Sequence, residues 1–142
     1  MPVSRAFLQH ALDLLAPGGP VQARPMFGGY GLFHRGAIFG LLDDDELYLK
    51  TDDANRRAFV DAGCRQWVYP SPKGPMPTSY YRPPDAAMED PEEMVPWARL
   101  AREAGARKQA ATGAKAKARS GRSRSRSRSR SGSRPKSRPR SR

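Results

Sequence analysis

The chain has 142 residues, a mass of 15.7 kDa and a formal net charge of +12 at pH 7, and this length suits one domain with an extension. No apolar run approaches the roughly 20 residues that span a bilayer, which excludes a membrane-spanning protein. The single cysteine, Cys64, excludes an intramolecular disulfide and a cysteine-rich zinc module. The chain shows no secretory signal, so we expect a cytoplasmic protein, with association with the nucleoid as one option.

The positive charge is confined to the end of the chain. Residues 1–104 contain 11 Lys and Arg against 14 Asp and Glu, a net charge of −3, whereas residues 105–142 contain 15 Lys and Arg and no acidic residue, a net charge of +15. The second segment also lacks Leu, Ile, Val, Phe, Trp, Tyr, Met and Cys, so it has no apolar surface to offset the entropy lost on ordering. The sequence predicts a folded domain over 1–104 and a disordered basic tail over 105–142, rich first in Ala, Lys and Arg and then in Ser and Arg.

The first half of the domain predicts one helix and three strands. Ser4 is placed to cap a helix, apolar residues follow it at helical spacing, and the Pro-Gly-Gly-Pro segment at 17–20 ends it. Three short apolar runs then alternate with turn residues, a pattern typical of an antiparallel meander. The predicted helix face comprises Phe7, Leu8, Ala11, Leu12 and Leu15, and the predicted strands comprise residues 24–33, 37–42 and 47–50.

The second half predicts a helix followed by two strands. Thr51 or Asp52 caps this helix, Ala58 and Phe59 face inward, and Gly63 ends it. Four prolines in eight residues predict a loop between the two strands. The predicted elements are a helix over 53–62, a strand over 66–69, a loop over 70–77 and a strand over 78–82.

A final helix opens at Asp90, with Pro91 at its first position and Glu93 placed to complete a capping box. Pro96 removes one backbone hydrogen bond and is expected to kink the first turns, or to move the start of the helix to Val95. The element order is then α-β-β-β-α-β-β-α. We predict an α+β fold, a single two-layer domain in which helices cover one face of an antiparallel sheet of about five strands.

Three glycines lie among aromatic residues in the segment Met26–Phe33. A phosphate-binding G-x-G-x-x-G loop that starts at Gly29 would need glycine where His34 stands, and it would need to lead into a helix rather than a strand. We interpret these glycines instead as a bend or bulge of a strand, where the backbone packs closely.

No group of side chains forms a recognisable catalytic or metal-binding pattern. His10 and His34 are isolated and lack metal-ligand spacing, and the contiguous run Asp43–Glu46 is typical of a charged hairpin tip rather than a calcium loop. Cys64 stands beside Arg65, which leaves open a reactive thiol and, as the favoured alternative, a half-buried bystander. Because no nucleophile has an evident base, we predict no enzymatic activity, no cofactor and no metal.

The Tyr and Trp residues of the domain can pack in the core, bind a partner or stack on bases. We expect most of them to pack in the core or on strand faces. We also expect an acidic domain to be a poor surface for phosphate groups, which disfavours the stacking of single strands there. These residues are Tyr30, Tyr48, Trp67, Tyr69, Tyr80, Tyr81 and Trp97.

The basic tail predicts binding to polyanions through the release of counterions. If about 6–10 cations meet phosphates, affinity for nucleic acid should fall by about 10³–10⁵ between 50 and 200 mM salt. Alternating Ser and Arg offer no fixed geometry toward base edges, so we expect binding that is nearly independent of sequence, and phosphorylation of the serines would neutralise it. The predicted nucleic-acid-binding residues are Lys115, Lys117, Arg119, Arg122, Arg124, Arg126, Arg128, Arg130, Arg134, Lys136, Arg138, Arg140 and Arg142.

The domain resembles the N-terminal domain of the TfoX/Sxy family in motifs that occur in order and with fitting gaps from about residue 4 to residue 104. The family motif, for which we expect a structural role, comprises Arg24, Met26, Phe27, Gly28, Gly29 and Gly31. Further matches are Ile38-Phe39, Leu47–Lys50, Asn55, Phe59, Tyr69, Ser79–Tyr81 and Trp97-Ala98.

The resemblance implies an α+β fold of the αβββαββα type and a bacterial, cytoplasmic, non-catalytic module. Family members include regulators of natural competence that act with a cyclic-AMP receptor protein, which implies a protein partner such as a transcription factor. Two-domain regulators of the family carry a helical C-terminal domain where this chain has its basic tail.

We therefore expect a non-enzymatic regulatory or adaptor protein that associates with nucleic acid through its tail, with a role in transcription or competence regulation. A protein–protein interaction module whose tail aids solubility or contacts RNA is the alternative. A third hypothesis is an enzyme or small-molecule binder that uses a cleft near Gly28–Gly31 and the Pro-rich segment 70–77. The oligomeric state, the partner and the choice between DNA and RNA are open at this point.

Overall fold

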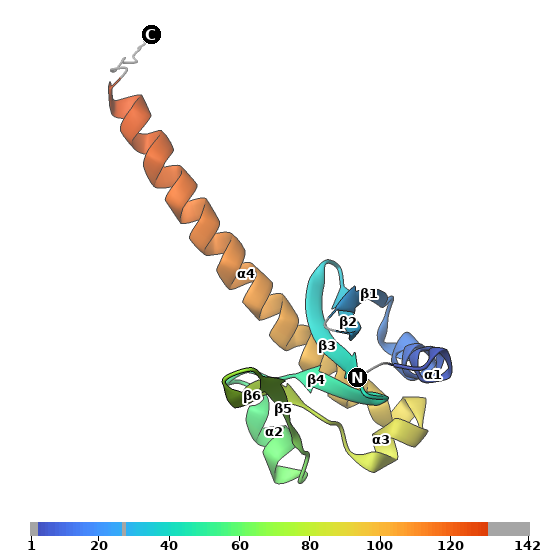
Figure 1. Ribbon diagram of the computed structural model, residues 1–142. Helices are drawn as coiled ribbons and strands as arrows, with labels where there is room; N and C mark the ends of the chain where they lie inside the picture. The colour runs from blue at the N-terminus through green and yellow to red at the C-terminus, as the bar shows by residue number, and fades with distance from the viewer. Residues whose placement is uncertain (1–2, 27, 131–142) are drawn as a thin grey trace. The chain divides into compact units, whose positions relative to one another are not determined.

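The computed structural model in Figure 1 describes the backbone of residues 3–26 and 28–130 and the side chains as far as residue 113. The chain divides into two compact units, Met1–Lys108 and Gln109–Arg142. We call the first unit the head. Among the described residues, no helix combines the length and the apolar character needed to cross a membrane.

The head has the predicted α+β architecture, with six strands rather than about five. Its strands form a single antiparallel sheet in the order β1-β2-β3-β4-β6-β5. In chain order the elements are α1 (Arg5–Leu15), the 3₁₀ turn η1 (Ala16–Gly18), β1 (Gln22–Met26), β2 (Gly29–His34), β3 (Ala37–Asp43), β4 (Glu46–Lys50), α2 (Arg56–Asp61), β5 (Gln66–Ser71), β6 (Gly74–Tyr81), α3 (Asp85–Glu89) and α4 (Pro91–Arg130).

The predicted strand over residues 24–33 is a hairpin of two strands, and the expectation of one bent strand was wrong. β1 and β2 pair antiparallel, with Met26 opposite Gly29. Gly28 lies in the turn with φ of +81°, a conformation that costs glycine little. The expectation of close backbone packing holds at Gly29, because a Cβ there would lie 1.9 Å from the carbonyl oxygen of Leu42.

The Pro-rich segment 70–77 is a second hairpin, which corrects the loop predicted there. β5 and β6 pair with Pro70 opposite Pro75 and Val68 opposite Pro77. β5 is the last strand of the sheet. On the other side of β6, the pairing with β4 includes only the end of β6, at Tyr80 and Tyr81. Proline lacks a backbone donor, so it is tolerated on such a marginal strand.

The helices begin near the predicted positions. Ser4 caps α1, and its hydroxyl oxygen accepts a hydrogen bond from the Phe7 backbone N–H at 3.1 Å. α2 is shorter than predicted, and Ala58 is exposed while Phe59 is buried. Sequence analysis missed α3, a helix of five residues. α4 begins at Pro91 as predicted, with Pro96 inside the helix near its start.

The hydrophobic core lies between the helices and one face of the sheet. Figure 1 shows α1 and α3 side by side at one end of the sheet, and His10 of α1 contacts the Met88 carbonyl of α3 at 3.0 Å. The core confirms the two-layer arrangement, since helices and strands contribute to one cluster. Its buried members are Ala11, Leu14, Leu15, Leu32, Phe39, Leu42, Leu47, Leu49, Phe59, Tyr81, Ala87, Met94, Ala98 and Ala101.

The head extends four residues beyond the predicted boundary at Ala104. Gly105 is buried, and a Cβ there would lie 2.5 Å from the carbonyl oxygen of Ile38. Arg107 forms an ion pair with Asp52 of the head at 2.7 Å. The helical backbone of α4 continues to Arg130. The predicted disorder of the tail stays a prediction, because the side chains of 114–130 and all of 131–142 lie outside the described residues.

Candidate functional site

The family motif lies in the β1–β2 hairpin and serves packing there. The Arg24 guanidinium lies 4.6 Å from the centre of the Phe33 ring. A Cβ at Gly31 would lie 2.9 Å from the end of the Met26 side chain and 3.1 Å from the Phe33 ring, so the absence of a side chain makes room for both. These contacts support the structural role expected for the motif. Phe27 lies outside the described residues.

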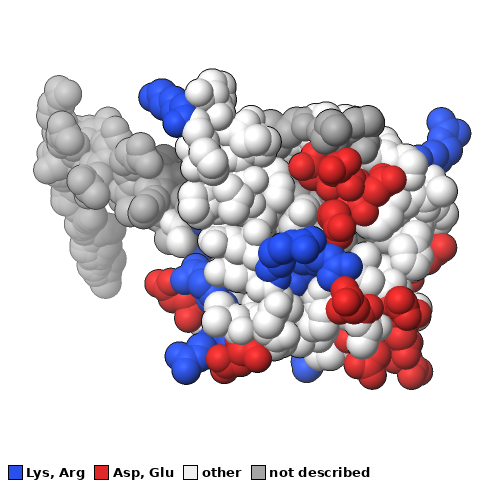
Figure 2. Space-filling model, turned by 60° about the horizontal axis from the view of Figure 1, so that its bottom comes forward, with Lys and Arg blue, Asp and Glu red and all other residues white. Residues whose placement is uncertain are grey.

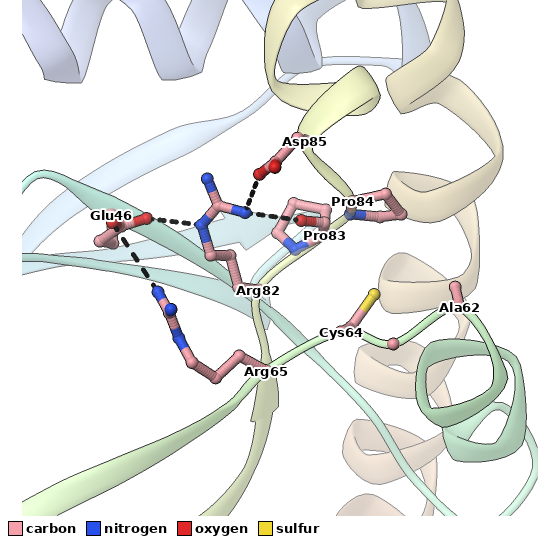
Figure 3. A pocket seen from close by; sticks show the side chains of 9 residues that line it. Glu46, Ala62, Cys64, Arg65, Arg82, Pro83, Pro84 and Asp85 are labelled. Carbon is pink, nitrogen blue, oxygen red and sulfur yellow. Dashed lines mark hydrogen bonds and ion pairs between the residues drawn. The ribbon is translucent and has the colours of Figure 1, made fainter.

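A hollow of about 500 Å³ lies where β4, β6 and α3 meet. Arg82 is at its centre: its guanidinium donates to Glu46 Oε1 at 2.8 Å, to Asp85 Oδ1 at 2.5 Å and to the Pro83 carbonyl at 3.4 Å. Arg65 approaches the second oxygen of Glu46 at 4.0 Å. Figure 3 shows both arginines turned toward Glu46, with the Cys64 thiol on the other side of the hollow.

The electrostatics of this hollow favour a structural role. The hydrogen bond that Arg82 donates to Glu46 is the main reason why the pKa of Arg82 lies above its ordinary value. Burial raises the pKa of the Cys64 thiol, and the nearby charge of Arg82 opposes this increase. Burial therefore disfavours the thiolate, and no histidine lines the hollow to act as its base. This supports the bystander interpretation of Cys64. Neither this hollow nor the next is lined by Gly28–Gly31 or by the Pro-rich segment.

A second hollow of about 330 Å³ lies beside the end of β4 and the first turns of α4. Arg107 binds the Asp52 carboxylate through two nitrogens, at 2.7 and 2.9 Å. This hydrogen bond is the main reason why the pKa of Asp52 is lowered. Lys50 has a lowered pKa, chiefly because of burial and then because of the charge of Lys108. Within the described residues, neither lysine forms an ion pair.

Arg102 is buried in the head and has a structural role that sequence analysis missed. One nitrogen of its guanidinium donates to the carbonyl oxygens of Leu15 at 3.0 Å and Gly19 at 3.2 Å, which joins α4 to the end of α1 and η1. The group also lies 4.9 Å from the centre of the Phe39 ring. Arg102 belongs to a charged run in the sequence, and no local pattern distinguishes it from the exposed Arg99.

The histidines and the acidic hairpin tip have local structural contacts. His34 Nδ1 contacts the Pro20 carbonyl at 2.9 Å, and both histidines are at least partly exposed. Asp44 and Asp45 form the β3–β4 turn with φ of 52° and 56°, which confirms the predicted charged hairpin tip. Among the residues that the structure describes, no three His, Cys, Asp or Glu side chains come together as metal ligands would.

The aromatic residues divide between the two faces of the sheet. Tyr81 and Trp97 contact Phe59 on the core face. Tyr48 lies between Leu47 and Leu49, which belong to the core, so alternation along the strand places Tyr48 on the opposite face. We call this opposite face the outer face. The Trp67 ring lies 5.7 Å from the ring centres of both Tyr48 and Tyr69 there.

Charge on the head is distributed in small patches. Figure 2 shows separate acidic and basic groups on one side of the molecule and no continuous basic surface among the residues that it colours by charge. The predicted nucleic-acid-binding residues, from Lys115 to Arg142, lie outside the described side chains, so their role stays a prediction.

Comparison with known proteins identifies the family. No curated protein matches the chain. The sequence matches the TfoX N-terminal domain family over residues 13–105, which is most of the head and includes the glycine motif, β1 to β6 and the start of α4. The TfoX N-terminal domain family is not a known enzyme family. Membership of the family supports at most a competence-related regulatory or adaptor role. The chain therefore belongs to the TfoX N-terminal domain family.

Proposed function

We propose that this chain is a non-enzymatic regulatory or adaptor protein of the cytoplasm. Its head binds a protein partner, such as a transcription factor, and its basic tail holds the complex on nucleic acid. The observation that carries the proposal is the separation of charge. The head, residues 1–108, has 13 basic and 14 acidic residues, whereas residues 109–142 have 13 basic residues and no acidic one.

This separation divides the two tasks physically. Lys and Arg bind phosphates mainly by releasing counterions, and this attraction carries no information about base sequence. The tail would therefore raise the local concentration of the head near nucleic acid. A target would be selected by the partner that the head binds.

The head offers no support for a catalytic role. The charged residues of its two hollows are ion pairs and two lysines, and burial raises the pKa of the thiol in the first, whereas catalysis needs a nucleophile or acid with an adjacent partner of matched pKa. Family membership also provides no catalytic residues to assign to this chain.

The test is a salt titration of the full chain on random-sequence DNA and RNA. We expect affinity to fall by about 10³–10⁵ between 50 and 200 mM salt if about 6–10 phosphate contacts form. A full-length variant in which Arg122, Arg124, Arg126, Arg128 and Arg130 are all changed to Gln should bind more weakly and show a salt slope about 4–5 units shallower. Binding that ignores salt, or that survives these substitutions unchanged, would contradict the proposal.

A matched control changes cations of the head instead. Arg5, Arg35, Arg57 and Arg99 are exposed, and changing all four to Gln should leave the affinity for random DNA nearly unchanged. A second experiment tests the alternative function, that of a protein–protein interaction module. It compares the proteins that the full chain captures before and after nuclease treatment. Partners that remain after treatment indicate a protein interaction module that does not need nucleic acid.

A further inference from the structure

The outer face of the sheet carries aromatic side chains that the core does not use. Alternation along β4 places Tyr48 and Lys50 on this face, because Leu47 and Leu49 point into the core. Lys50 pairs with Tyr80 of β6, and its ammonium group lies 5.1 Å from the centre of the Tyr80 ring. Trp67 joins them through its contact with Tyr48.

The rings of this face are held in fixed positions. The Trp67 and Tyr48 rings are inclined by only 32°, and Tyr69 meets Trp67 edge-on at 62°. Trp67 and Tyr80 are nevertheless only half-buried. A ring that is held by neighbours and still partly open to solvent loses little conformational entropy when a flat partner stacks on it.

Two cations lie on this face, Lys50 and, because its neighbour Ala23 packs against the core, Arg24. Neither Lys50 nor Arg24 forms an ion pair within the described part of the chain. Each lies instead beside an aromatic ring, Lys50 beside Tyr80 and Arg24 beside Phe33. Glu46, which lies on the same face of β4, is occupied by Arg82 at 2.8 Å.

The charges beside the rings of the outer face differ from those of the head as a whole. The expectation that an acidic domain is a poor surface for phosphates therefore does not apply to this face. Two acidic residues near these rings are held by arginines, Glu46 by Arg82 and Asp52 by Arg107. Lys50 and Arg24 lie beside rings of the sheet and form no ion pair among the described residues. Flat rings with unpaired cations beside them match a polymer of flat bases joined by phosphates.

We propose that the outer face of the sheet is a stacking platform for single-stranded nucleic acid, with Trp67 and Tyr80 contacting bases and Lys50 and Arg24 contacting phosphates. Six strands at about 4.8 Å spacing give a face about 24 Å wide, enough for a few nucleotides. The inference rests on the proposed function, because the basic tail delivers the polymer. It adds a preference for single strands that the tail alone does not supply.

The first test uses the emission of Trp67 in the full chain. The sequence has two tryptophans, and Trp97 lies on the core face, so a full-length Trp97→Phe protein reports on Trp67 alone. Oligo(dT), a random DNA duplex and inorganic polyphosphate are added at low salt. Stacking predicts that oligo(dT) quenches the emission, whereas polyphosphate binds the tail and leaves the emission unchanged. Equal quenching by oligo(dT) and polyphosphate, or none by either, overturns the platform.

The second test compares affinities in a background with both tryptophans. Trp67→Ala should weaken binding of oligo(dT) about five-fold or more and change duplex binding less than two-fold. Val60→Ala is the matched control, because Val60 is an exposed apolar side chain of α2 and should leave both affinities unchanged. Lys50→Gln, which preserves the aromatic packing, should weaken oligo(dT) binding and reduce its salt slope by about 0.7.

The outcomes separate the two proposals. If neither oligo(dT) nor duplex binds the full chain, the proposed function fails. If both bind and Trp67→Ala and Lys50→Gln alter neither affinity, only the platform is overturned, and the outer face is then a candidate surface for a protein partner. Weaker oligo(dT) binding by Trp67→Ala and by Lys50→Gln, with the control unchanged, supports the platform.

Discussion

Asp52 performs two tasks with one carboxylate. Its Oδ1 accepts hydrogen bonds from the backbone N–H groups of Ala54 and Asn55, which shapes the turn before α2. The same side chain accepts two hydrogen bonds from Arg107, 55 residues later in the chain. An Asn at this position keeps an acceptor for the turn and removes the charge, so the substitution isolates the ion pair.

We expect Asp52→Asn to lower the free energy of unfolding by about 0.5–1 kcal/mol at pH 7, because the pair is partly exposed and screened by solvent. The pKa of Asp52 in the folded state lies below its ordinary value of 3.8, so its contribution is complete above that value and is lost as the pH falls through the lower pKa of the folded state. Urea denaturation at pH 7 and at pH 3 measures the difference between the two proteins, which should shrink at pH 3. A difference independent of pH would contradict this origin.

Sequence analysis assigned Arg107 to the tail because composition gave the only boundary signal. The sequence shows that Asp52 can cap a turn, but it does not show which cation will reach Asp52 across 55 residues. For the same reason, the sequence did not predict the buried position of Arg102 or the ion pair between Arg82 and Glu46. Side-chain partners from distant segments depend on the packing of α4 and the sheet, which no local spacing encodes.

The terminal strands of the sheet both contain proline. Pro25 lies in β1 and Pro70 lies in β5, and these are the two ends of the strand order. Exposed edge strands invite pairing with other chains, and proline weakens that pairing. The double substitution Pro25→Thr and Pro70→Thr should therefore produce concentration-dependent oligomers, which light scattering after size-exclusion chromatography would detect. Replacement of Pro72, in the β5–β6 turn, is the control and should leave the oligomeric state unchanged.

At the level of elements, the sequence was a reliable guide where local chemistry decides. The cap at Ser4, the turn at Asp44 and Asp45 and the start of α4 at Pro91 all follow from backbone preferences of a few residues. The two hairpins were missed for a physical reason. Glycine is compatible with both a bend and a turn, and proline occurs both in loops and on edge strands. Strand pairing decides between these alternatives, and it places Gly28 in a turn and Pro70 in the terminal strand β5.

For the whole molecule, the extended boundary predicts where the chain can be shortened. A protein of residues 1–108 should keep the melting temperature of the full chain, whereas one of residues 1–104 should melt several degrees lower. The shorter protein lacks Gly105, which packs against Ile38, and Arg107, which binds Asp52. A loss of about 1 kcal/mol corresponds to roughly 4–8 °C for a domain of up to 100 residues. Equal melting temperatures, measured by calorimetry, would indicate that the folded domain ends at Ala104, as the sequence predicted.

The fold class and the division into head and tail were predictable because they depend on composition and hydrophobic pattern. The outer-face platform was not, because its residues come from β4, β5 and β6 and share a face only through strand register. The aromatic residues were identified individually from the sequence. Their separation into Tyr81 and Trp97 on one face and Tyr48 and Trp67 on the other required the sheet.

The position of α4 has a consequence for biosynthesis. Its buried residues Met94, Ala98, Ala101 and Ala104 complete the core, and they are the last part of the head to be translated. The core therefore stays open until the ribosome has passed them. At least 34 residues follow, from Gln109 to Arg142, so the ribosome adds them, at about 5–20 residues per second, after the last core residue of the head has been made.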